Sequence, residues 1–349
     1  MKKLETNLNH DYGLDIIRII AMFFVILVHS TTFYGFIDEG IHSFGLFLAG
    51  IGRYLSFACV PLFIMLTGYL SLNKTPTLKY YVKLLRILIE FVICAIVVAL
   101  FRRLYLHDTM SIGAFLKGVL RFSFPNYSWY INMFVGLYCL APFLNYILKA
   151  IPQNYVITLV IVLLFLFSFP IASPYWEDAY PLMYYFFGAL IRVNKDNIKV
   201  KKIYLIAIII IVTLLQTVQV KYQFIPVLNV NNHYNVGCVV LSVCIFLLFC
   251  NKTSNSKNAT LKKSLRIIAN ASLSTFLVSS IFETLTMQYF SKLALTSFSE
   301  KLPYLLYLTP LKFIASVLVA IIINIVAIYI YKLFILLLNK ITKNKYNFN

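Results

Sequence analysis

The chain has 349 residues, of which 61% are hydrophobic and only 12% are charged, and its formal net charge is +19. Together with a mean hydropathy of +0.83, this composition excludes a soluble globular enzyme and is typical of an integral membrane protein. The sequence shows no internal repeat, no linker-like stretch and no polar block long enough for a soluble domain. Residues 1–349 are therefore expected to form a single transmembrane domain.

Ten apolar segments are each near or above the length that a helix needs to cross about 30 Å of hydrocarbon. The predicted fold class is therefore all-α, a polytopic integral membrane protein with about ten transmembrane helices. The expected spans are residues 13–30, 45–72, 84–101, 128–148, 154–174, 179–193, 202–220, 234–250, 267–290 and 311–338. Segment 179–193 is short enough to be tilted, re-entrant or partly interfacial. The polar residues 1–10, with no small-residue cleavage site after the first span, predict that this span is retained.

The distribution of Lys and Arg predicts the orientation. Most of these residues precede the first span, follow the last span or lie in alternate connections, and the positive-inside tendency places such regions in the cytoplasm. With an even number of spans, both termini are then cytoplasmic. The connection after the third span departs from this pattern because it holds four cations, Arg102, Arg103, Lys117 and Arg121. The net charge thus indicates topology and attraction to anionic membrane lipids, not nucleic-acid binding.

The first span carries two ionisable residues on one face. Arg18 and His29 are eleven residues apart, which brings the helix back to within about 20° of the same direction and separates them by roughly 16 Å along the axis. Ionisable groups at bilayer depth are costly and usually face a cavity or a partner, so both are functional candidates. The carboxylate of Asp15, one turn earlier, most simply neutralises Arg18.

The spacing of cysteines and histidines does not indicate a metal site or a disulfide. The six cysteines lie inside apolar segments without paired spacing, and the five histidines form no His-x-x-x-His motif. We therefore expect no metal, and we interpret the cysteines as small buried hydrophobic residues.

Four stretches within residues 11–145 together resemble a known family. In chain order they are Gly13-Leu-Asp15 with Arg18 and His29, the segment SFACVPLFIMLTGYL at 56–70, the basic pair Lys83 and Arg86, and Trp129-Tyr130 followed by Gly136-Leu-Tyr138 and Pro142-Phe-Leu144. Each stretch alone is a weak signal, but the ordered set resembles acyltransferase family 3, the membrane-bound O-acyltransferases. One departure is Ser279, which stands where many members of that family have a histidine.

The resemblance implies an O-acyltransferase, most often an O-acetyltransferase, in the plasma (inner) membrane of a bacterium. It implies acetyl-CoA as a cytoplasmic acyl donor and a polysaccharide or lipid-linked glycan of the cell envelope as acceptor. His29 would then be the base or a transient acyl carrier, and Arg18, Lys83 and Arg86 would hold the coenzyme phosphates. Trp129 and Glu283 are the candidates for contacting the acceptor sugar.

Simpler interpretations stand beside these roles. Basic residues at helix ends also serve as topology determinants, Trp129 fits an aromatic belt, and Glu283 fits an interfacial carboxylate. Glu90, one turn after Arg86, is expected to pair with that residue. Two other functional classes also remain open: a secondary transporter of a polar solute or lipid-linked sugar, and a non-catalytic subunit of an envelope assembly.

Overall fold

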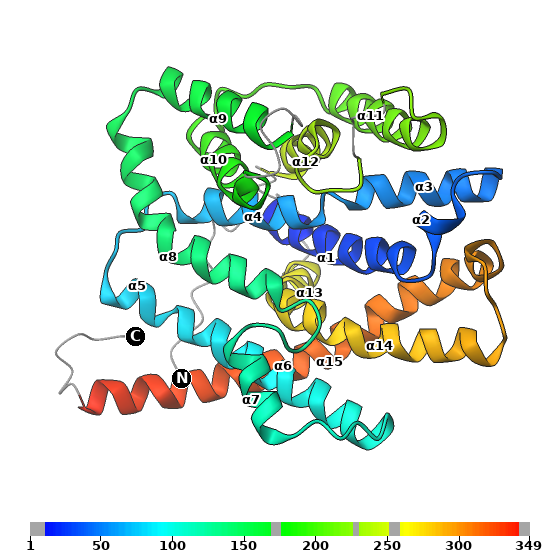
Figure 1. The fold of residues 1–349 in the computed structure, drawn as a ribbon. Coiled ribbons are helices and arrows are strands. Elements are labelled where there is room, and N and C mark those ends of the chain that lie inside the picture. The colour runs from blue at the N-terminus through cyan, green and yellow to red at the C-terminus, as the bar shows by residue number, and fades with distance from the viewer. Residues whose placement is uncertain (1–10, 169–175, 226–229, 251–258, 342–349) are drawn as a thin grey trace.

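The computed structural model describes residues 11–168, 176–225, 230–250 and 259–341, and every regular element in these ranges is helical (Figure 1). The elements are α1 (Tyr12–Thr32), α2 (Phe36–Glu39), α3 (Phe44–Ser56), α4 (Cys59–Ser71), α5 (Leu78–Val82), α6 (Leu84–Tyr105), α7 (Ile112–Leu120), α8 (Trp129–Ala150), α9 (Gln153–Ser168), η1 (Glu177–Ala179), α10 (Tyr180–Val193), α11 (Lys202–Tyr222), α12 (Val236–Phe249), α13 (Ala259–Asn270), α14 (Ser272–Lys292) and α15 (Phe298–Ile341).

Six stretches of the described chain are helical, long and apolar enough to cross a membrane, and the bent pair α13–α14 would make a seventh. The α3–α4 pair counts as one of these stretches, as does α5–α6. The other expected spans, 154–174, 179–193 and 234–250, fall on the shorter helices α9, α10 and α12. Residues 169–174 of the first of these lie outside the described residues.

Two predicted boundaries are wrong. The span 267–290 is not one helix, because α13 and α14 meet at Ala271 with a bend of 64°. The span 311–338 belongs to a helix that begins at Phe298, despite Pro303 and Pro310. Phe298 packs into a cluster with Tyr34 and Phe290, so tertiary contacts stabilise a helical turn that hydropathy and the two prolines argued against.

Local caps explain where several helices begin. Asp11 accepts a hydrogen bond from the backbone N–H of Gly13 at the start of α1, and Ser43 caps α3 through the N–H of Leu46. Pro61 lies in the first turn of α4, where a missing N–H costs little because that group has no partner within the helix. The break between α3 and α4 at residues 57–58 precedes this turn.

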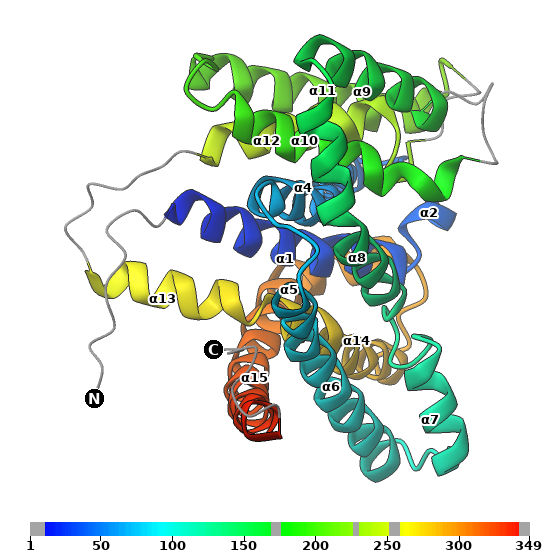
Figure 2. The same cartoon turned by 90° about the vertical axis from the view of Figure 1, so that its left-hand side faces the viewer.

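Most of the helices fall into three groups, and α1 belongs to the middle one (Figures 1 and 2). One group contains α9 to α12, a middle group contains α1, α3 and α4, and a third contains α6, α13, α14 and α15. Helix α1 contacts α3, α4, α12, α13, α14 and α15. The charged face of the first predicted span is therefore enclosed by other helices, as expected for ionisable residues at depth.

Candidate active site

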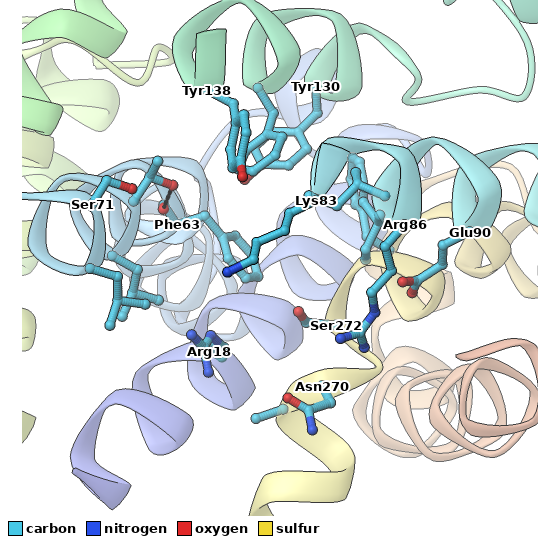
Figure 3. A pocket seen from close by; sticks show the side chains of 18 of the residues that line it. Arg18, Phe63, Ser71, Lys83, Arg86, Glu90, Tyr130, Tyr138, Asn270 and Ser272 are labelled. Atoms are coloured by element: carbon cyan, nitrogen blue, oxygen red, sulfur yellow. Dashed lines mark hydrogen bonds between the residues drawn. The ribbon is translucent and has the colours of Figure 1, made fainter. Parts of the chain in front are cut away.

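A cavity of about 950 Å³ opens beside α1, between α4, α6, α8, α14 and α15. Its lining includes all three cations that the sequence singled out, Arg18 of α1 together with Lys83 and Arg86 at the start of α6. In Figure 3 these three side chains point toward the same space. The structure thus brings together residues that lie 65 or more positions apart in the sequence.

Arg18 is held in place by its own helix. Its Nη1 donates to Oδ1 of Asp15 at 3.0 Å, and Asp15 is fully buried. This is the predicted neutralising pair, and it fixes the guanidinium nearly two turns from the start of α1. Lys83 is exposed to the cavity mouth, and Lys332 of α15 adds a fourth cation to the lining.

Glu90 has different partners from those expected. Its Oε1 accepts from Ser274 Oγ at 2.5 Å, and its Oε2 accepts from Asn324 Nδ2 at 3.2 Å. The carboxylate therefore joins α6 to α14 and α15, and the charge of Arg86 acts on it without an ion pair within 4.0 Å among the described residues. Arg86 keeps its charge directed at the cavity, where Asn270 and Ser272 add polar groups (Figure 3).

The deep wall of the cavity is aromatic and ends next to His29. Tyr130 and Phe276 line it and meet edge to face, with ring centroids 5.5 Å apart. The imidazole of His29 is 6.5 Å from the Phe276 ring and 4.2 Å from the Tyr127 ring. His29 Nδ1 is buried and has no hydrogen-bond partner among the described residues. His29 itself does not line the cavity, and its nitrogen lies behind this aromatic wall. An unpartnered imidazole nitrogen can accept a proton.

Comparison with known families settles the affiliation. A family model described as an acyltransferase domain matches residues 11–329, nearly the whole chain. This chain belongs to acyltransferase family 3. No curated protein and no solved structure matches it. The membership and the apolar helices together make it a multi-pass membrane acyltransferase.

Glu283 of the acyltransferase lies in a buried ion pair, not at an interface. Its Oε2 accepts from Nζ of Lys312 at 2.5 Å and from the hydroxyl of Tyr34 at 2.8 Å. Lys312 also donates to Oγ of Ser30 at 2.6 Å, the residue after His29. Lys312 could not be recognised from the sequence, because its position near the start of an expected span is typical of an interfacial cation.

Arg53 is a second buried cation that the sequence analysis missed. Its side chain is 2% exposed and donates from Nη1 to Thr31 at 2.9 Å and to Thr32 at 2.8 Å. Its guanidinium also stacks over the Phe57 ring at 5.1 Å. The contacts fasten the end of α1, just beyond His29, to α3. An arginine inside an apolar segment could have been recognised from sequence by the cost of its burial.

Trp129, like Glu283 and His29, is not among the residues that line the cavity. Trp129 is 46% exposed and packs against Tyr130, so it is the neighbouring tyrosine that lines the cavity. Ser279, in the place of a family histidine, donates to the backbone carbonyl of Phe276 on its own helix at 2.7 Å. It therefore makes a side-chain to backbone hydrogen bond within α14. The imidazole of His29 lies beside the Phe276 ring of the cavity wall.

Proposed function

We propose that this acyltransferase moves an acyl group, in the first place acetyl, from a cytoplasmic acyl-CoA to a hydroxyl of a cell-envelope glycan. The observation that carries the proposal is one cavity whose lining includes Arg18, Lys83 and Arg86. His29 lies behind the aromatic wall at its other end. A phosphorylated donor with a long thin arm and a reactive thioester fits such a site, because charge is needed only at one end.

The chemistry follows from this arrangement. His29 takes the proton of the acceptor hydroxyl as its oxygen forms a bond to the acyl carbon. The carbon–sulfur bond breaks, and the proton passes from His29 to the leaving thiolate. Arg18, Lys83 and Arg86 contribute binding and orientation, which raise the rate by holding the thioester close to the hydroxyl.

Whole-cell glycans test the reaction class. Alkali-labile acyl esters are measured by mass spectrometry in wild type, in a deletion strain, and in that strain complemented with His29→Ala or His42→Ala at matched protein levels. His42 is an exposed matched control, and its Nε2 lies 3.8 Å from Oε1 of Glu39. We expect the ester to be lost on deletion, restored by His42→Ala and not restored by His29→Ala. Unchanged esters with altered glycan export would replace the proposal with the transporter interpretation.

Donor binding tests the cationic end separately. Acetyl-CoA is titrated calorimetrically into the protein in nanodiscs, with Arg86→Gln, Lys83→Gln and the exposed control Lys74→Gln. Because a hydrogen bond to a charged group contributes about 1.5–3 kcal/mol, each cavity variant should weaken binding roughly 10- to 100-fold. Lys74→Gln should bind as wild type does. Equal binding by all four proteins would remove the phosphate role from these residues.

A further inference from the structure

A second, smaller cavity lies at the far end of α6 from Lys83 and Arg86. Its volume is about 230 Å³, room for a single sugar ring or a group of similar size, and α6, the segment before α8, and α14 form its walls. Arg102 lies sixteen residues beyond Arg86 on α6, roughly 24 Å along the helix axis. The two cavities therefore serve opposite ends of the helix group.

Both cavities are lined by α6, by α14 and by residues near the start of α8, and His29 itself lines neither of them. On α14 the main cavity uses residues up to Phe276, and the small cavity begins one turn later at Ser280. In the segment before α8 the small cavity uses Asn126 and the main cavity uses Tyr130. In each case the aromatic ring next to His29, that of Phe276 or Tyr127, falls at the boundary.

The lining of the small cavity combines polar groups with apolar surface. Arg102, Asn126, Ser280 and Thr284 supply polar groups, and side chains such as Phe101 and Ile281 supply apolar surface. A sugar matches this pairing because its rim carries hydroxyls and its ring face carries C–H groups. A few fixed polar groups in an apolar wall are the usual means of orienting a small ligand.

Arg102 is the strongest recognition element in this cavity. Its Nη2 is held by Asp108 at 2.6 Å, and its guanidinium lies over the Phe124 ring at 5.7 Å. Its Nε is buried without a hydrogen-bond partner among the described residues. A guanidinium that is already oriented and keeps a free donor can bind an anionic oxygen at little entropic cost.

The connection that follows Arg102 in the sequence carries further positive charges. Arg103, Lys117 and Arg121 are all exposed in this connection, where Asp108 is the acidic residue between them. These are the cations that the positive-inside pattern left unexplained. A cluster of one sign attracts a partner of the opposite sign and raises its local concentration.

We infer that the small cavity is the acceptor site and that it selects an anionic glycan, one that carries carboxylates or phosphates beside its free hydroxyls. The inference rests on the proposed acyl transfer. The donor would bind the main cavity, one unit of the glycan would enter the small cavity, and the reacting hydroxyl would meet the thioester at His29. The exposed Lys117 and Arg121 would hold the neighbouring units of the same chain.

Binding of defined oligosaccharides tests this inference. Fluorescently labelled tetragalacturonate and a glycerol-phosphate oligomer serve as the anionic probes, and cellotetraose of matched length serves as the neutral probe. Fluorescence anisotropy is measured in phosphatidylcholine nanodiscs for wild type, Arg102→Gln, Asn126→Ala and Arg103→Gln. Arg103→Gln removes the same charge from the next residue, which does not line the cavity. Acetyl-CoA binding is measured on every sample, so that a misfolded variant or a failed donor site is recognised independently.

We expect at least one anionic probe to bind tenfold or more tightly than cellotetraose. Arg102→Gln should weaken it at least tenfold, Asn126→Ala severalfold and Arg103→Gln less than threefold, with acetyl-CoA binding unchanged in all three. Equal losses in Arg102→Gln and Arg103→Gln would overturn the inference, because only general charge attraction would remain. Competition by phosphatidylglycerol that depends on Arg102 would overturn it in favour of a lipid headgroup site. Failure of acetyl-CoA to bind wild type would count against the proposed function itself.

Discussion

At the scale of single residues, the contact between Glu283 and Lys312 shows where sequence reasoning ends. The sequence predicts Glu283 as a contact for the acceptor sugar or as an interfacial carboxylate, whereas the structure buries it in an ion pair. Its partner comes from another helix, and a sequence without known contacts cannot pair them. The same holds for Glu90, whose neighbour Arg86 was the obvious local partner, although Ser274 and Asn324 are the ones that bind it.

Removing one member of the Glu283–Lys312 pair should destabilise the protein strongly. Both side chains are less than a tenth exposed, so Lys312→Met leaves a buried carboxylate without its counter-ion, at a cost of about 3–5 kcal/mol. Glu283→Gln should cost a similar amount. The double variant should recover much of this loss because no uncompensated charge remains. Unfolding is followed by heating in detergent.

The control for this double-mutant cycle is Glu300→Gln. Glu300 is exposed near the start of α15 and accepts local backbone hydrogen bonds, so its replacement should change stability by much less than either single variant. If the losses of the two single variants simply add in the double variant, the ion pair contributes no coupling, and the buried-charge explanation is wrong.

At the scale of helices, the sequence predicts that a helix exists more reliably than it predicts where that helix begins and ends. Hydrophobic length placed α1, α6 and α11 to within a few residues, because lipid requires each apolar helix to be long. It failed where tertiary packing decides, at the bend between α13 and α14 and at the start of α15. Gly68 lies in the apolar segment 56–70 and serves close helix packing, which hydropathy does not reveal.

The crossing of α4 and α10 depends on two glycines. A Cβ built on Gly68 would lie 2.0 Å from the carbonyl oxygen of Tyr185, and one on Gly188 would lie 2.0 Å from that of Met65. The backbones therefore approach as closely as small residues allow, as membrane helices often do. Helix α10 has only 14 residues, and this contact helps to explain how so short a helix is held in the interior.

Gly188→Ala should force these helices apart. We expect a loss of about 1–3 kcal/mol in stability, the usual range for overpacking. Weaker acetyl-CoA binding should accompany it, because α4 contributes Phe63 and Thr67 to the main cavity. Gly136→Ala is the matched control, since a Cβ there meets nothing within 4 Å; it should be neutral or stabilising by up to about 1 kcal/mol. Equal melting temperatures for both variants would contradict this explanation.

At the scale of the whole molecule, the proposed donor and acceptor cavities lie toward opposite ends of the helices. Helix α5 and the end of α15 lie at one end, and α2 with the turn between α14 and α15 lies at the other (left and right in Figure 1). Lys83 and Arg86 belong to the first end, while Arg102 ends the same helix far from them. The sequence could predict this separation because charges at helix ends are fixed by helix length alone. It could not predict the two cavities, or that the rings of Tyr127 and Phe276 would lie beside His29.

Labelling of introduced cysteines tests which end faces the cytoplasm. In a Cys139→Ser background, whose other native cysteines are buried, a membrane-impermeant maleimide is applied to intact and to permeabilised cells. Because the positive-inside tendency places the turn before α6 in the cytoplasm, Lys74→Cys should react only after permeabilisation. Lys117→Cys on α7 should react in intact cells. Both positions are exposed, so neither result depends on burial. The opposite pattern would place Arg18, Lys83 and Arg86 on the outer side, where cytoplasmic acyl-CoA cannot reach them, and the proposed direction of acyl transfer would fail.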